Sequence, residues 1–153
     1  MFRNIAGVVL GLMVAMGLVL VIELVGMTIV PPPEGIMSVD KVKQQAAFAE
    51  LTPASFAFVL AAWTVGSFGG SLVAALTCAS RRMVLAGIIA AFLWFAALVN
   101  LISIPSPVWF WVAGLTLIPL AWWLAVQVAL IIRPNRPRGP QPFDMRAKNM
   151  ACK

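Results

Sequence analysis

The sequence predicts an all-α integral membrane protein, a four-helix up-down bundle with a short extramembrane amphipathic helix in its first outer loop. The first observation is composition: 62% of the 153 residues are hydrophobic and 10% are charged, whereas soluble domains average about 45–50% apolar and 25% charged residues. The second is that the apolar residues gather in four long runs. The third is that these runs lack the polar face of a surface helix in a soluble protein. Together the three observations exclude a soluble single-domain enzyme.

The four runs occupy residues 5–30, 55–78, 84–103 and 108–132. About 20 helical residues are needed to cross a 30 Å hydrocarbon core, whereas strands of a membrane barrel have about ten alternating residues. The runs therefore predict helices. The first run is longer than the roughly 7–15 residues of a signal-peptide core, so we expect an uncleaved first span. Residues 1–132 then form one transmembrane domain.

The connection after the first run begins with three prolines, residues 31–33, which cannot continue a helix. Gly35 indicates a turn, and Ser38 is the expected N-cap of a short helix over residues 39–51. Apolar residues recur at helical spacing along this helix, so we expect it to lie on the outer membrane surface or against the bundle. The expected apolar stripe consists of Val39, Val42, Ala46 and Ala49.

The later boundaries carry helix-start signals. Thr52 and Pro53 are typical of an N-cap and a first helical residue, and Ser106 and Pro107 repeat the pattern before the fourth span. The connections between the last three spans are short, which makes sequential spans antiparallel neighbours. Inside the fourth span, Pro119 is expected to kink the helix and to free a backbone carbonyl.

Lysine and arginine are distributed unevenly between the two sides. Nine lie on the side that holds both termini and two on the other, which predicts a bacterial inner (plasma) membrane protein with cytoplasmic N- and C-termini. The net charge of +6 therefore indicates topology. The sequence lacks the array of basic and aromatic residues that would indicate nucleic-acid binding, so we expect no nucleic-acid partner. The basic, proline-rich cytoplasmic tail, residues 133–153, is expected near anionic headgroups, with docking to a partner protein as the alternative. Expected lipid or partner contacts are Arg81, Arg82, Arg133, Arg136, Arg138, Trp109 and Trp111.

Small residues recur every fourth position in the first two spans, and such ladders allow membrane helices to pack closely. We favour packing within one chain, and homodimerisation is the alternative. The residues expected at this helix packing are Gly7, Gly11, Ala62, Gly66, Gly70 and Ala74.

Glu23 is the only ionisable residue within the four runs. A charged side chain at the bilayer centre costs at least about 2.5 kcal/mol on insertion scales, so Glu23 requires partners. By depth along the spans, we expect a buried polar cluster of Glu23, Asn100, Thr64 and Ser103. Three roles of Glu23 stay open: hydrogen bonding between helices that fixes their register, a proton or cation site, and pairing with a partner subunit.

The sequence contains no histidine, no tyrosine and two cysteines. This excludes histidine-based triads and histidine metal sites, so we expect no catalytic residues, no metal and no cofactor. The expected function is that of a non-catalytic structural or accessory subunit packing against other membrane proteins or itself. The alternative is a proton- or cation-coupled small-molecule transporter or oligomeric channel that uses Glu23.

Two motifs carry a resemblance to a known group. They are Pro-Pro-Pro-Glu-Gly at residues 31–35 and Asn-Leu-Ile-Ser-Ile-Pro-Ser-Pro-Val-Trp-Phe-Trp at residues 100–111. The chain resembles small four-span bacterial inner-membrane proteins. This resemblance implies an inner-membrane localisation and a four-span topology. Histidines that often occur in that group are replaced here by Met27 and Ser106. Glu23 with Gly26 also resembles small multidrug resistance transporters, although the first connection is longer here.

Overall fold

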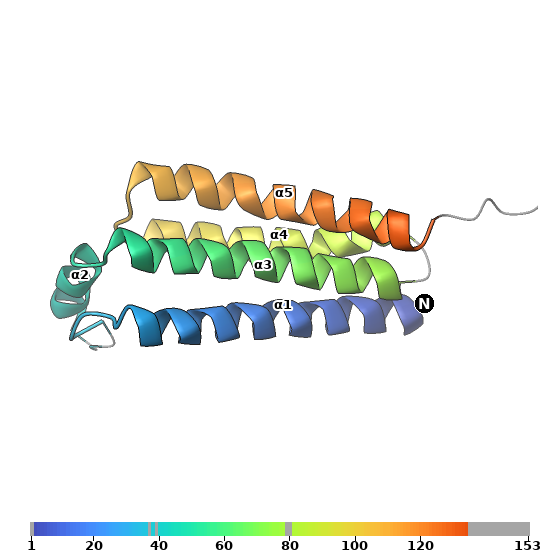
Figure 1. The fold of residues 1–153 in the computed structure, drawn as a ribbon. Helices are drawn as coiled ribbons and strands as arrows, with labels where there is room; N and C mark the ends of the chain where they lie inside the picture. The colour runs from blue at the N-terminus through green and yellow to red at the C-terminus, as the bar shows by residue number, and fades with distance from the viewer. Residues whose placement is uncertain (1, 37, 39, 79–80, 135–153) are drawn as a thin grey trace, which may run out of the picture.

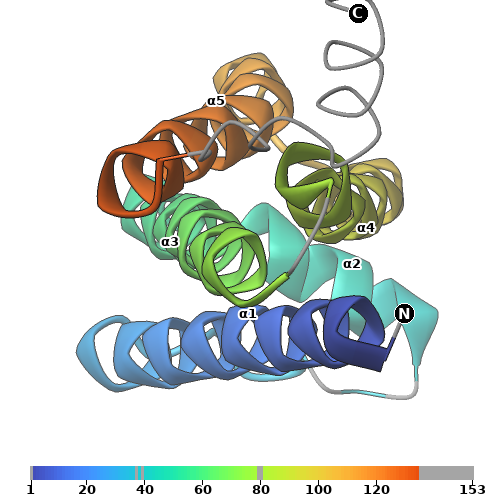
Figure 2. The ribbon, with the colours of Figure 1, turned by 90° about the vertical axis from the view of Figure 1, so that its right-hand side faces the viewer.

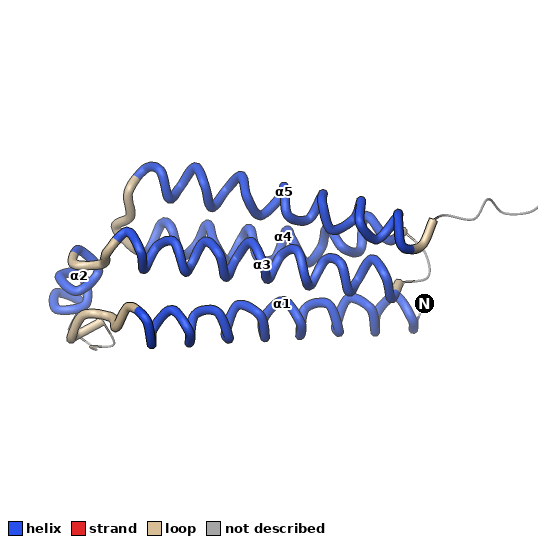
Figure 3. Tube along the Cα trace, in the orientation of Figure 1, coloured by secondary structure: helices blue, strands red, loops and turns tan. Residues whose placement is uncertain are grey.

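The protein consists of five helices, as expected for an all-α membrane protein. The structure, a computed structural model, describes residues 2–36, 38, 40–78 and 81–134. Within these ranges every regular element is a helix (Figure 3). The helices are α1 (Phe2–Ile29), α2 (Lys41–Ala49), α3 (Pro53–Thr77), α4 (Arg82–Ser103) and α5 (Val108–Ile132). All but α2 are long and apolar enough to cross a membrane. The predicted fold class is confirmed, and the observed spans lie within three residues of the expected ones.

Helix α3 is the centre of the bundle, because α1, α4 and α5 each pack more extensively on α3 than on any other span, although α4 also touches α1. Viewed end-on, α1 lies against one side of α3, while α4 and α5 lie on the other (Figure 2). The four spans run side by side along their length, and α2 crosses one end (Figure 1). That end, which we call the α2 end, is the one predicted to face outward. The N-terminus of α1 and the C-terminus of α5 lie at the opposite end.

The two glycine ladders of α1 and α3 pack against each other within one chain. A Cβ placed on Gly70 would lie 2.7 Å from the carbonyl oxygen of Gly11, and one on Gly11 would lie 2.7 Å from the carbonyl oxygen of Gly70. Further along, a Cβ on Gly66 would lie 3.1 Å from the carbonyl oxygen of Ala15. The backbones are therefore too close for any larger side chain. All six residues of the expected ladder are buried, with Ala62 and Ala74 fully so.

Polar groups join α3 to the two helices on its other side. The Ser67 hydroxyl donates to the Ile118 carbonyl at 3.1 Å, and the Ser71 hydroxyl donates to the Ala86 carbonyl at 3.3 Å. Both serines are completely buried. Because a hydroxyl in an apolar interior needs a hydrogen-bond partner, these two bonds fix how α4 and α5 sit on α3.

The proline in α5 frees a carbonyl, and a side chain from α4 satisfies it. Pro119 has no N–H to donate to the carbonyl four residues earlier, which is that of Leu115. The indole N–H of Trp94 donates to this carbonyl at 3.2 Å. The carbonyl that Pro119 frees in α5 therefore forms a hydrogen bond that joins α5 to α4.

Several expected boundaries at the α2 end need correction. Helix α2 is capped by Asp40, whose carboxylate accepts from the Val42 N–H at 3.0 Å. The expected cap, Ser38, instead accepts from the Asp40 N–H, so the helix begins two residues later than expected. Thr52 caps α3 as expected, through the Ser55 N–H.

The fourth span starts at Val108 as expected, but its expected N-cap and the expected apolar stripe of α2 are wrong. Helix α5 has Pro107 as its N-cap, with no side-chain capping bond, and the Ser106 hydroxyl is buried without a partner. On α2, the described stripe residues Val42, Ala46 and Ala49 are exposed. Ala47 is buried and Phe48 half-buried, because the larger apolar surface of Phe48 determines which face turns to the bundle.

At the end opposite α2, arginine side chains bond to the C-terminal carbonyls of two helices. The Arg82 guanidinium donates to the carbonyl of Arg133, the C-cap of α5, at 3.0 Å, and the Arg133 guanidinium donates to the carbonyl of Leu76 in the last turn of α3 at 2.7 Å. Cations stabilise the unsatisfied carbonyls of helix C-termini. Arg81 is exposed and has a left-handed backbone, with φ 49°. Arg136 and Arg138 lie outside the described residues.

Candidate functional site

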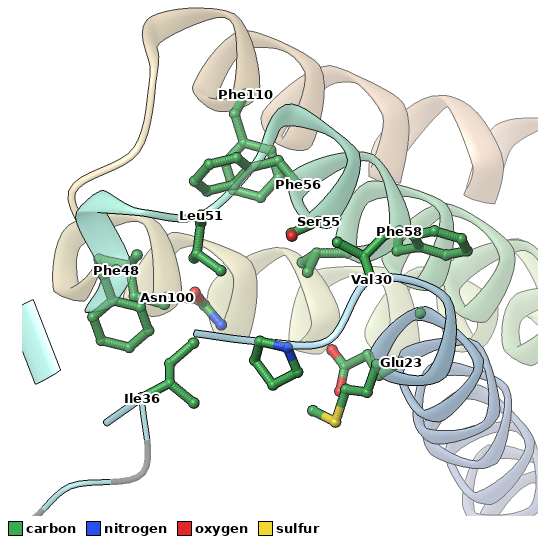
Figure 4. Close-up of a pocket in the computed structure, with 15 residues that line it drawn as sticks. Glu23, Val30, Ile36, Phe48, Leu51, Ser55, Phe56, Phe58, Asn100 and Phe110 are labelled. Carbon is green, nitrogen blue, oxygen red and sulfur yellow. The ribbon is translucent and has the colours of Figure 1, made fainter. Parts of the chain in front are cut away.

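A cavity of about 220 Å³ lies at the α2 end of the bundle. All four spans, α2 and the segment after α1 contribute to its wall (Figure 4). The lining is mostly apolar and carries three polar side chains. Its residues are Glu23, Gly26, Met27, Val30, Pro32, Ile36, Phe48, Leu51, Ser55, Phe56, Phe58, Val59, Asn100, Ile104 and Phe110. A mostly apolar hollow with a few convergent polar groups is the usual form of a small-molecule site.

The cavity brings together two of the four residues expected in a polar cluster. Glu23 extends from α1 and Asn100 from α4, and both line the hollow (Figure 4). Glu23 is half-buried, and Asn100 is exposed. Among the described residues, no hydrogen-bond donor or cation is bonded to the Glu23 carboxylate. The carboxylate is therefore available to a ligand.

The other two expected residues do not line the cavity. The Thr64 hydroxyl donates to the Leu60 carbonyl at 2.7 Å, and the Ser103 hydroxyl donates to the Val99 carbonyl at 2.7 Å. Each bond is made to the residue's own helix, four residues earlier. Such bonds satisfy a hydroxyl in an apolar environment without a partner helix. Ser103 lines two shallower hollows beside α4 instead.

Four aromatic side chains support the cavity from α3 and α5. The ring of Phe110 lies 4.9 Å from that of Phe56, 5.5 Å from that of Trp63 and 5.9 Å from that of Trp109, centroid to centroid. Phe110 is 3% exposed, whereas Trp109 is 46% exposed. Trp109 and the half-buried Trp111 therefore belong partly to the bundle, in addition to any contact with lipid. The cluster gives the wall of the cavity a fixed shape.

The segment between α1 and α3 covers the cavity. Gly35 makes the turn, with φ +94°, and the side-chain amide of Gln44 donates to the Ile36 carbonyl at 3.3 Å. This bond attaches α2 to the turn. From α2 onward, Phe48 and Leu51 reach down to the cavity (Figure 4). The sequence placed Glu23 and Asn100 at a similar depth but gave no sign that this segment would enclose them.

The described residues contain no group of three histidine, cysteine, aspartate or glutamate side chains that could hold a metal ion. A lone carboxylate is a poor site for Ca²⁺ or Mg²⁺, which take six or more oxygen ligands. The chemistry of the cavity is therefore that of one carboxylate, one amide and one hydroxyl within an aromatic wall.

Comparison with protein-family models, curated proteins and solved structures gave no match. The fold and the cavity define the class of the protein on their own. It is a small polytopic membrane protein with four candidate spans and, at the α2 end, a mostly apolar cavity lined by Glu23.

Proposed function

We propose that this protein is a non-catalytic accessory subunit of a membrane assembly. The observation that carries the proposal is the exposed face of α1. Only one face of α1 packs on the bundle, and α1 does not touch α5 among the described residues. Its other faces present large apolar side chains, among them Met13, Met16 and Met27, each at least 46% exposed. Methionine adapts to varied partner surfaces, so this face suits another membrane helix.

The rest of the bundle supports a structural role. The buried serines Ser67 and Ser71 donate to backbone carbonyls of neighbouring helices. A serine nucleophile needs an adjacent base to activate it, whereas each of these hydroxyls donates its proton to a main-chain carbonyl. These hydroxyls hold helices together, which is the task of a scaffold.

A photo-crosslinking amino acid at Met16 tests this proposal in intact cells. We expect one discrete crosslink to a different membrane protein, because Met16 lies on the exposed face of α1. The matched control carries the same group at Trp123 on α5, which is similarly exposed, 47% against 48% for Met16. Crosslinks to this protein alone, or equal and diffuse products from both positions, would contradict the proposal.

The second candidate is a proton- or cation-coupled carrier, and the position of Glu23 favours it. Ionisable residues within spans commonly mark ion or substrate pathways, and Glu23 lines the cavity. In proteoliposomes with a potassium diffusion potential and an internal pH dye, this candidate predicts proton uptake that Glu23→Gln abolishes. If neither protein moves protons while both keep the same helical content, the carrier function is wrong.

A further inference from the structure

We propose that the cavity at the α2 end binds a small organic monocation, an ammonium group carried on a compact apolar body, with Glu23 as its counter-ion. This inference goes beyond the accessory function and does not depend on it. An accessory subunit can hold such a ligand, and a protein without a protein partner can hold one equally well.

The charge of the cavity selects a cation. Glu23 is the only ionisable residue among the fifteen that line it. Its carboxylate has no bonded cation or donor among the described residues. An unpaired carboxylate in an apolar site is costly, and a ligand with one positive charge would remove that cost. An anion would meet repulsion from Glu23 and no compensating cation in the lining.

The wall selects an organic cation over a metal ion. Four phenylalanines line the cavity: Phe48, Phe56, Phe58 and Phe110. The faces of aromatic rings attract ammonium groups when the cation lies within about 6 Å of the ring centre. The same rings provide apolar surface for the body of the ligand. A hydrated metal ion would gain from neither.

The volume limits the size of the ligand. The hollow of about 220 Å³ is smaller than the roughly 300–1,000 Å³ of sites for drug-sized molecules. Asn100 lines the cavity and is exposed, so its amide can bond to a polar substituent of the ligand. Benzylammonium, with one ring and one charge, is a suitable probe.

The test measures binding to the full-length protein in nanodiscs of zwitterionic phosphatidylcholine, by calorimetry. We expect benzylammonium to bind at least tenfold more tightly than benzyl alcohol, which has the same shape without the charge, and benzoate not to bind. We expect Glu23→Gln to weaken benzylammonium binding at least tenfold. The matched control is Glu34→Gln, which removes an exposed carboxylate between Pro32 and Ile36 and should leave binding unchanged.

Two results would overturn the proposal: equal affinity for benzylammonium and benzyl alcohol, or equal losses in Glu23→Gln and Glu34→Gln. If Glu23→Gln does not fold, Val59→Trp provides the second test, because it fills the cavity from α3 and keeps the carboxylate. Loss of binding in that variant supports the site, and unchanged binding places the ligand elsewhere. Since none of these measurements involves a protein partner, their failure is distinguishable from failure of the accessory function.

Discussion

Replacing Gly70 with leucine is expected to lower the free energy of unfolding by about 3 kcal/mol, the upper end of the usual cost of overpacking a core. A Cβ at this position would already lie 2.7 Å from the Gly11 carbonyl oxygen and 2.6 Å from the Ala15 Cβ. Neither atom can rotate away, so the whole of α1 must move off α3. The measurement is unfolding of the purified protein by sodium dodecyl sulfate, followed by tryptophan fluorescence.

Gly17 provides the matched control. It lies on α1, and a Cβ built on it meets nothing within 4 Å. Gly17→Leu should be neutral or slightly stabilising, since leucine has a higher helix propensity than glycine. Gly70→Ala should fall between the two. Equal stability of Gly70→Leu and Gly17→Leu would mean that the two ladders do not pack on each other. That result would instead favour the alternative, in which the ladders mediate homodimerisation.

The spans could be predicted from the sequence because length and hydropathy alone determine them. A run of 20 or more apolar residues has no other stable form than a helix across the bilayer. The positions of Gly11 and Gly70 were also informative, because a glycine that recurs every fourth residue marks a face where backbones approach.

The candidate site could be predicted only in part, since depth along a helix can be counted but rotation about its axis cannot. In a helix that is apolar all round, hydropathy does not show which face turns inward, and the small-residue ladders mark only the faces where α1 and α3 meet. Glu23 and Asn100, which the sequence placed at a similar depth, both line the cavity, but Asn100 is exposed there and not part of a buried cluster. Thr64 and Ser103 lie at suitable depths, but their hydroxyls bond to their own helices.

The residues that do join the helices carried a signal of their own. Ser67 and Ser71 are four residues apart and each directly follows a ladder glycine, Gly66 or Gly70. They therefore form a second stripe beside the first, on the faces of α3 toward α4 and α5. A polar stripe adjacent to a small-residue stripe predicts that one helix contacts neighbours on two sides, as α3 does.

Replacing Phe110 with alanine is expected to be the second strongly destabilising change. Phe110 is 3% exposed, and its ring lies between those of Phe56, Trp63 and Trp109. In soluble cores a change from phenylalanine to alanine costs about 3–5 kcal/mol. Lipid is as apolar as the bundle interior, so the part of this cost due to transfer from water is smaller here. We therefore expect about 3 kcal/mol, measured by the same detergent unfolding.

Phe95→Ala is the matched control, because Phe95 is 64% exposed on α4. Its ring contacts lipid in both the folded bundle and the separated helices, so its removal should change stability by less than about 0.5 kcal/mol. Equal losses in the two variants would show that ring area in the membrane, and not packing between α3 and α5, determines stability. A loss confined to Phe110→Ala would establish that the aromatic cluster holds the start of α5 against α3. Since Phe110 also lines the cavity, the shape of that hollow then depends on the same packing that stabilises the bundle.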